Sequence, residues 1–238
     1  DIAYHLNKLK RGFDRLIDIW GPDHHGYIPR LKASVEALGY DRKKISVLIV
    51  QLATLFRGGE TLSMSTRKGE FITLGEVIDE VGGDVTKFFF LMRNLDSHLD
   101  FDLETAKKSS MDNPVYYIQY AHARIASING FCEKLKGKLS KVRYNPELHS
   151  GPGELSLIRK LSEFPLAIEA AARTLEPYRI VEYLNDLAKE FHSFYAKHRV
   201  VSDDNVELTK ARLTLVLGVK AILASGLDLL GISFPERM

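Results

Sequence analysis

The sequence has few of the features that mark specialised classes of protein. Its 238 residues contain one cysteine, Cys132, which excludes an internal disulfide and is typical of a reducing compartment. The densest apolar run, residues 47–53, is interrupted by Gln51 and is far too short to span a bilayer. No signal peptide, internal repeat or low-complexity segment is visible. We therefore expect a soluble cytoplasmic protein.

A dominant charge of one sign is also missing. The 33 basic and 31 acidic residues leave a formal net charge of +2. This balance does not by itself indicate a nucleic-acid-binding protein, so an RNA-binding role has to rest on local patches or motifs. Hydrophobic residues make up 45% and charged residues 27%, which is ordinary for a globular protein and argues against disorder.

The two ends of the sequence differ. Asp1 begins inside a pattern, without an initiator methionine or a preceding turn, whereas residues 229–238 read as a natural terminus after a long helix. These features predict a fragment that is cut at its N-terminal side.

The first hundred residues show an α/β pattern. The apolar run at 15–20 ends at Gly21-Pro22 and predicts a strand followed by a turn. Residues 27–38 have apolar positions at helical spacing, and a β-branched run from 45–50 towards Phe56 predicts a second, buried strand. Strand, helix and strand in this order predict a parallel βαβ unit.

From Leu74 onward the apolar period becomes helical. Asp112-Asn113-Pro114 supplies a capping side chain and a proline for the start of a long helix. Asp204 and Glu207 have the spacing of a capping box for the last helix. The other helices are expected at 75–80, 84–95, 103–110, 154–163, 177–198 and 206–230. Several long helices with short connections predict an antiparallel bundle, and we place the domain boundary at about 110–113, which gives domains at 1–111 and 112–238.

The turn from Trp20 to Gly26 follows the first expected strand. Ligands bind beyond the carboxyl ends of the strands in an open α/β sheet, so Gly21, Asp23 and His24 or His25 could bind a nucleoside. Alternatively, the segment is a polar turn in which Asp23 caps the next helix. Asp23-His24-His25 also suits a metal, as in a family of phosphoesterases named for this triplet. Because the further aspartates which that family needs do not precede residue 23, we expect no metal site.

Two basic segments could bind phosphate. The polar stretch 63–69 combines hydroxyls with adjacent Arg67 and Lys68, which suits a loop that closes over a polyphosphate. The alternative is a solvated basic hairpin. A second basic run contains Lys134, Lys136, Lys138, Lys141 and Arg143. It could contact several phosphates, although a solvated surface is the simpler interpretation.

Several segments together resemble one family. Met64-Ser65 with Gly69 matches the frame of the Lys-Met-Ser-Lys-Ser loop of class I aminoacyl-tRNA synthetases. Within that class the chain resembles arginyl-tRNA synthetase over its whole length. The segments that carry this resemblance are residues 1–5, 11–14, 19–27, 64–74, 88–93, 96–102, 113–124, 211–213 and 231–238.

The resemblance implies a mainly α fold with a partial α/β part, namely the C-terminal half of a Rossmann-like catalytic core followed by an antiparallel helical anticodon-binding domain. It implies an arginine–tRNA ligase, monomeric as the whole enzyme and not bound to membranes. Its substrates would be L-arginine, ATP with Mg²⁺ and arginine-accepting tRNA, and it would hold no tightly bound metal.

The same resemblance implies roles for individual residues. Asp1 would bind the guanidinium of the substrate arginine, and helices within 74–111 would contact the tRNA stem. Tyrosines stack on unpaired bases and arginines bind phosphates or base edges, although any one of these tyrosines could simply pack between helices. The implied ATP-binding residues are Gly21, Asp23, His24, His25 and Met64; the implied catalytic residues are Ser65, Arg67 and Lys68; the implied tRNA-binding residues are Gln119, Tyr120, His122 and Arg124.

Two departures from the family pattern matter. Ser63 and Thr66 occupy the positions of the two loop lysines, so the resemblance does not assign separate roles to Arg67 and Lys68. The His-x-Gly-His-type motif that grips the ATP phosphates is absent from the sequence. We therefore expect residues 1–238 alone to form no arginyl-adenylate. The alternatives are a non-catalytic tRNA-binding helical module and a helical interaction scaffold without a role in RNA binding.

Overall fold

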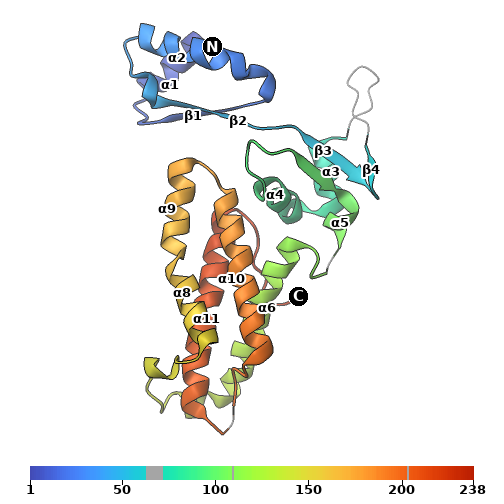
Figure 1. Ribbon diagram of the computed structural model, residues 1–238, viewed down its shortest axis with the longest axis vertical. Helices are drawn as coiled ribbons and strands as arrows, with labels where there is room; N and C mark the ends of the chain where they lie inside the picture. Colours follow the sequence, from blue (N-terminus) through green and yellow to red (C-terminus); the bar gives the residue numbers. More distant parts are fainter. Residues whose placement is uncertain (63–71, 109, 203) are drawn as a thin grey trace. The chain divides into compact units, whose positions relative to one another are not determined.

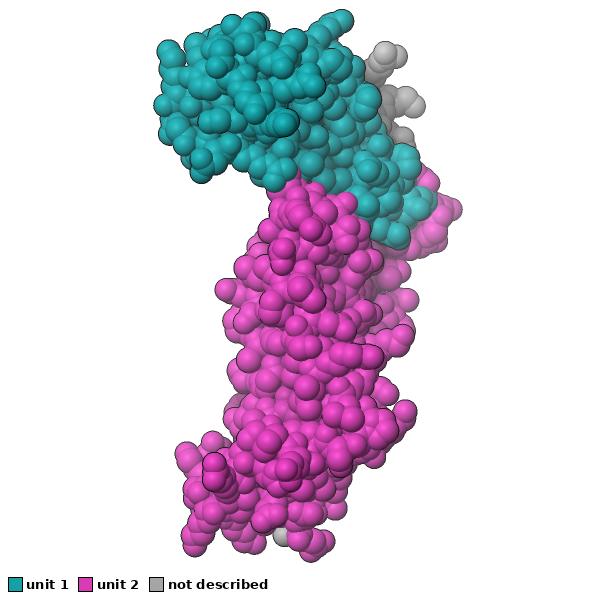
Figure 2. Space-filling view, turned by 60° about the vertical axis from the view of Figure 1, so that its left-hand side comes forward, with its two compact units in different colours: residues 1–56, 93–101 teal, residues 57–92, 102–238 magenta. Residues whose placement is uncertain are grey.

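The computed structural model describes residues 1–62, 72–108, 110–202 and 204–238, and most of them are helical (Figure 1). The chain divides into two compact units, which Figure 2 colours separately. Unit 1 comprises residues 1–56 and 93–101, and unit 2 comprises residues 57–92 and 102–238. Part of the expected N-terminal domain thus belongs to the same unit as the bundle, and the boundary at about 110–113 stays a prediction.

Unit 1 is built around a parallel pair of strands. β1 (Leu16–Trp20) pairs with β2 (Ile45–Ile49), with Leu16 opposite Ile45 and Trp20 opposite Ile49. Helix α2 (Ile28–Ala37) lies between the two strands in the chain, so the predicted βαβ unit is confirmed. The remaining elements of this part are α1 (Ile2–Lys10), η1 (Pro22–Tyr27), η2 (Arg42–Lys44) and all but the last residue of β3 (Ala53–Arg57) and of β5 (Leu99–Asp102). Helix α1 was not among the expected elements.

The helices of unit 1 cover one face of its parallel strand pair. Leu9 of α1 and Val35 of α2 are buried together with Leu16 and Ile45 of the strands. Because successive side chains of a strand point to opposite faces, Ile17 and Ile19 of β1 lie on the other face. Their side chains are 44% and 67% exposed.

Unit 2 contains all of the long helices. Two short connecting helices, α3 (Leu74–Val81) and α4 (Gly83–Leu91), precede α5 (Leu103–Lys107). The other elements are β4 (Glu60–Thr61), α6 (Pro114–Cys132), η3 (Glu133–Leu135), α7 (Lys136–Leu139), η4 (Pro146–Leu148), α8 (Pro152–Ser162), α9 (Phe164–Thr174), α10 (Tyr178–Lys197) and α11 (Val206–Leu229). Every expected helix is present, and the short helix α7 and α9 are additional ones.

Helix starts in the bundle are fixed by asparagine side chains. Asn113 accepts a hydrogen bond from the Val115 amide (3.2 Å) and donates to the carbonyls of Ala106 (2.9 Å) and Lys108 (3.0 Å), which confirms the predicted start of α6. The prediction for α11 was wrong by one residue. Its N-cap is Asn205, which accepts from the Leu208 amide (2.9 Å), instead of Asp204 with Glu207. Both residue types suit this position, and only the path of the chain decides between them.

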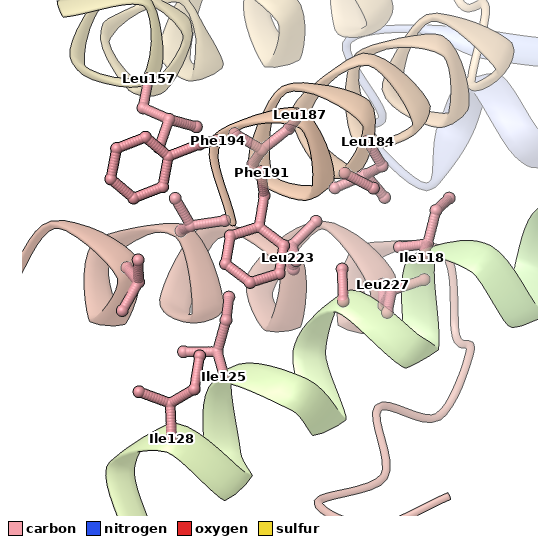
Figure 3. Close-up of a cluster of buried hydrophobic side chains, with 14 of the residues drawn as sticks. Ile118, Ile125, Ile128, Leu157, Leu184, Leu187, Phe191, Phe194, Leu223 and Leu227 are labelled. Carbon is pink, nitrogen blue, oxygen red and sulfur yellow. The ribbon is translucent and has the colours of Figure 1, made fainter. Parts of the chain in front are cut away.

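The core of unit 2 lies between α6, α8, α10 and α11, where the buried side chains interdigitate (Figure 3). Leu184, Leu187, Phe191 and Phe194 form the apolar stripe of α10 at helical spacing. Gly226 of α11 permits close helix contact, since a Cβ atom there would lie 2.6 Å from the Leu184 side chain. Among the described helices, none combines the length and the apolar character that a bilayer span requires.

Candidate functional site

A groove runs along the bundle between α6 and α10. Its larger part has a volume of about 1070 Å³ and is lined by both helices, by residues 198–201 and by Arg237 and Met238. A neighbouring hollow of about 680 Å³ shares Tyr120, Arg124 and Tyr195 with it. The two hollows form one surface, which we call the α6–α10 groove.

Flat aromatic rings surround a cation in this groove. The rings of Tyr116 and Tyr120 stack with centroids 6.2 Å apart, and Tyr120 stacks on His192 at 5.9 Å. The Arg124 guanidinium lies 5.1 Å from the Tyr120 ring centroid and 4.9 Å from that of Tyr195. Aromatic faces beside arginine are the surfaces on which proteins stack unpaired nucleic-acid bases.

His192 contributes an uncharged ring to the groove. Burial lowers its pKa and nearby Arg124 lowers it further, which outweighs the hydrogen bond to the Tyr117 carbonyl. The ring is therefore neutral at pH 7, and Nε2 donates to that carbonyl over 3.3 Å. A neutral imidazole can be covered by a stacked ring without the desolvation cost that a charged imidazolium would carry.

Gln119 and His122 lie on another side of α6 from Tyr120 and Arg124 and hold the C-terminal segment. Gln119 donates to the Ser233 carbonyl (2.9 Å), and the Nδ1 atom of His122 lies 2.9 Å from the Pro235 carbonyl. The His122 side chain is 1% exposed. Of the four residues assigned to tRNA binding by resemblance, the structure therefore places Tyr120 and Arg124 in the groove and uses the other two to position residues 231–238.

Further bonds fasten the same segment. Asp84 of α4 accepts hydrogen bonds from the backbone and side chain of Ser233, and Lys87 donates to the Gly231 carbonyl (2.7 Å). Lys220 of α11 pairs with Glu236 at 2.7 Å. Arg237 and Met238 follow directly and line the groove.

The groove contains residues that sequence reasoning missed. His192, Tyr195 and Arg199 belong to α10 and the segment after it, and Arg237 belongs to the C-terminal segment. The signal available in the sequence was the row of polar aromatic residues beside the apolar stripe of α10. It does not show that this row faces α6.

A buried polar cluster lies at the start of α8. Glu154 is 2% exposed, and its Oε1 atom accepts from the Arg212 guanidinium at 2.8 and 2.9 Å. Burial alone would raise the pKa of Glu154, but the hydrogen bonds from its own backbone and from Arg212 hold that pKa below its usual range. His149 is also buried, and this burial lowers its pKa.

Unit 1 has a separate cavity of about 580 Å³ between α1, β1, η1 and α2. Its wall contains Asp18, which is 7% exposed and bonded to His5 Nε2 (2.7 Å) and Lys8 Nζ (2.9 Å). Burial alone would raise the pKa of Asp18, but these two bonds hold it below its usual range. His5 Nδ1 also donates to the Asp1 carbonyl over 2.8 Å, so one buried network holds the start of α1.

The structure brings together some of the residues that are expected to bind ATP and arginine. Asp1 and His24 both line the cavity, beside Trp20. Gly21 is the N-cap of η1, with open space where a side chain would be. Asp23 and His25 are exposed on η1, outside the residues that line the cavity.

The alternative role of Asp23 as a helix cap is wrong, because α2 begins after Tyr27 without a side-chain cap. Met64, Ser65, Arg67 and Lys68 lie outside the described residues. Within the described part of the chain, no three metal-ligating side chains gather at one place.

Comparisons with known proteins agree on one family. Residues 118–238 match the model of the DALR anticodon binding domain. An arginine–tRNA ligase of Geobacter sp. (strain M21) is 54% identical over 240 residues, covering 100% of this chain and 43% of that protein. The chain thus spans less than half the length of this relative.

Solved structures give the same result. A Campylobacter jejuni protein assigned as an arginyl-tRNA synthetase has a TM-score of 0.87 and 35% identity, covering 100% of this chain and 51% of that one. Thermus thermophilus arginyl-tRNA synthetase shares the fold, with a TM-score of 0.70 and 24% identity over 94% of this chain and 41% of its own. The chain belongs to the DALR anticodon-binding family and corresponds to the C-terminal region of arginyl-tRNA synthetases.

Proposed function

We propose that the α6–α10 groove binds the anticodon loop of arginine-accepting tRNA, and that the chain supplies tRNA selection to an arginine–tRNA ligase. The observation that carries this proposal is the arrangement of Tyr116, Tyr120, His192 and Tyr195 around Arg124. Four of these five residues lie within the segment that matches the DALR anticodon binding domain.

The chemistry of the groove suits an unpaired RNA loop. Stacking of one base on an aromatic side chain contributes about 1–3 kcal/mol and tolerates any base. Arg124, Arg199 and Arg237 add guanidinium groups, which bind phosphates or base edges. A small apolar ligand would not need this combination of exposed rings and cations.

Substitution of Tyr120 tests the proposal. Tyr120→Ala removes a ring that stacks with Tyr116 and His192 and lies beside Arg124, so we expect the Kd for arginine-accepting tRNA to rise about 5- to 100-fold. Fluorescence anisotropy with labelled tRNA measures this change. Tyr120→Phe keeps the ring and should bind nearly as the wild type does. Tyr178→Ala, at the start of α10, is a control outside the groove.

Two results would contradict the anticodon proposal. One is unchanged affinity of Tyr120→Ala. The other is equal, weak binding of all tRNAs by the wild-type chain, which would indicate a general polyanion surface.

For unit 1 we propose a part in forming arginyl-adenylate from arginine and ATP with Mg²⁺. The carboxylate of arginine attacks the α-phosphate in line, and pyrophosphate leaves. This reaction needs positioning and charge stabilisation more than covalent catalysis. The cavity that contains Asp1 and His24 supports the proposal, since a carboxylate matches a guanidinium and the open backbone at Gly21 allows a flat nucleoside to approach.

Residues 63–69 would supply the groups that close over ATP, in which Met64 contacts the nucleotide and Ser65, Arg67 and Lys68 act on its phosphates. We also propose that Asp23 and His25, which are exposed on η1, contact the nucleotide. Arginine-dependent ATP–pyrophosphate exchange tests whether the chain acts alone. We expect no exchange by residues 1–238 without further protein, and measurable exchange would contradict this expectation.

One observation favours the alternative of a tRNA-binding module without catalysis. Every residue that lines the α6–α10 groove belongs to unit 2. Binding to tRNA can therefore persist in a polypeptide that performs no chemistry. The combination of tRNA binding with absent pyrophosphate exchange would support this alternative for residues 1–238.

A further inference from the structure

A basic segment, residues 134–143, follows α6 and contains Lys134, Lys136, Lys138, Lys141 and Arg143. It covers the end of η3, helix α7 and the turn after it. All five side chains are exposed, and the segment contains no acidic residue. It therefore presents a local positive surface on a chain whose formal net charge is only +2.

Apolar side chains fix this basic segment to the bundle. Leu139 is 6% exposed and belongs to the core, and Leu135 packs against the same core. The two residues are four positions apart and so share one side of the helical turns. The basic side chains consequently stand on a supported backbone, unlike those of a loose tail.

Most of these cations have no protein partner to neutralise them. Lys136 pairs with Glu133 at 3.4 Å. Lys134, Lys138, Lys141 and Arg143 form no ion pair with any described residue. Their charge is available to a polyanion.

The basic segment continues from the end of the α6–α10 groove. Phe131 lines the groove, and the Lys134 ammonium lies 5.7 Å from the centroid of its ring. On the other side, Lys138 borders a small cleft with Ser202, which directly follows the groove residues Val200 and Val201. A strand of RNA that leaves the groove at this end meets the basic segment next.

We propose that the basic segment is a second RNA-binding surface, which contacts the backbone phosphates of the anticodon stem while the groove holds the unpaired bases. The inference rests on the proposed anticodon-binding function and adds a site to it. The exposed lysines contact phosphates as point charges, so they strengthen binding without reading sequence.

Salt-dependent tRNA binding by the whole chain tests this inference. The variant Lys134→Gln/Lys138→Gln/Lys141→Gln removes three unpaired cations and keeps part of each aliphatic stem. Each phosphate contact contributes about 0.7–0.9 to the slope of log Kd against log salt concentration. We expect the slope to fall by about 2 and the Kd at low salt to rise about tenfold.

A matched variant controls for net charge. Arg159→Gln/Arg173→Gln/Lys189→Gln removes the same number of exposed cations from α8, α9 and α10, where no described ion pair involves them. This control should change the Kd less than about twofold and leave the salt slope at the wild-type value. Unchanged melting curves of both variants would show that the fold is intact.

Two results would overturn the inference. In the first, the basic-segment variant binds tRNA with the same Kd and salt slope as the control variant. In the second, it loses binding to anionic phospholipid vesicles but keeps full affinity for tRNA, which would assign the segment to a membrane surface. Failure of the anticodon proposal itself would give different results, namely unchanged affinity of Tyr120→Ala or equal, weak binding of all tRNAs by the wild-type chain.

Discussion

The two units bury their apolar side chains in different ways. In unit 2, α6, α8, α10 and α11 enclose one continuous core (Figure 3). In unit 1, a small cluster lies between two helices and one face of β1 and β2, while Ile17 and Ile19 face outward. The two candidate sites are therefore supported in different ways. The groove lies on a fully packed scaffold, whereas the cavity of unit 1 depends on a buried polar network of Asp18, His5 and Lys8.

The largest expected effect is loss of packing in the bundle. Leu187 is fully buried in α10, so Leu187→Ala should lower the free energy of unfolding by about 2–5 kcal/mol. Urea unfolding followed by circular dichroism measures this loss. Leu187→Met keeps most of the volume and should cost less than about 1.5 kcal/mol. A loss below about 1 kcal/mol for Leu187→Ala would show that the core is less tightly packed than the structure indicates.

Mild acid should destabilise unit 2 more than unit 1. Burial lowers the pKa values of His149 and His192 in unit 2, so the unfolded state binds more protons than the folded state below about pH 6.5. The free energy of unfolding of unit 2 is therefore highest above that pH and decreases as the pH falls below it. The pKa of Asp18 in unit 1 is lowered instead from 3.8, so its contribution is lost only in stronger acid.

Hydrogen exchange resolved by peptide checks this difference. Between about pH 7.5 and 5.5, corrected protection should fall in α10 around His192 and stay constant in β1. The variant His192→Gln should reduce the pH dependence of α10. Equal loss of protection in both units would contradict the assignment to the buried histidines.

The smallest effect is expected on the open face of β1. Ile19 is 67% exposed, so Ile19→Thr should change the free energy of unfolding by less than about 0.5 kcal/mol. Thermal unfolding of residues 1–238 measures it. A loss above about 1.5 kcal/mol would mean that another surface covers this face in solution.

Much of the fold could be predicted from the sequence because local signals agree with the final packing. The β-branched run at 45–50 and the Asn113-Pro114 start lead to β2 and α6 as expected. Helices α1, α7 and α9 were missed. Helix α1 has no side-chain cap, and α7 spans only four residues. Helix α9 follows α8 almost directly, and Pro165 in its first turn is the signal that could have marked its start. Asp204 was preferred to Asn205 because two adjacent residues both suit an N-cap.

The candidate site was predictable only in part. Helical spacing alone would separate Tyr120 and Arg124, four residues apart, from Gln119 and His122, three apart. The sequence does not show which of these faces stays open, since that depends on where residues 231–238 return to the bundle. The same limit hides His192 and Tyr195, whose contact with α6 is a property of tertiary packing.

The fastening of the C-terminal segment has a practical consequence for anyone who produces this protein. Met238 lines the α6–α10 groove, and Asp1 lines the cavity of unit 1. A fluorescent label attached at Met238 or at Asp1 would therefore lie at a candidate ligand site and compete with the ligand for space. An exposed internal position is the better place for a label, and Ser150, in the connection between η4 and α8, offers one.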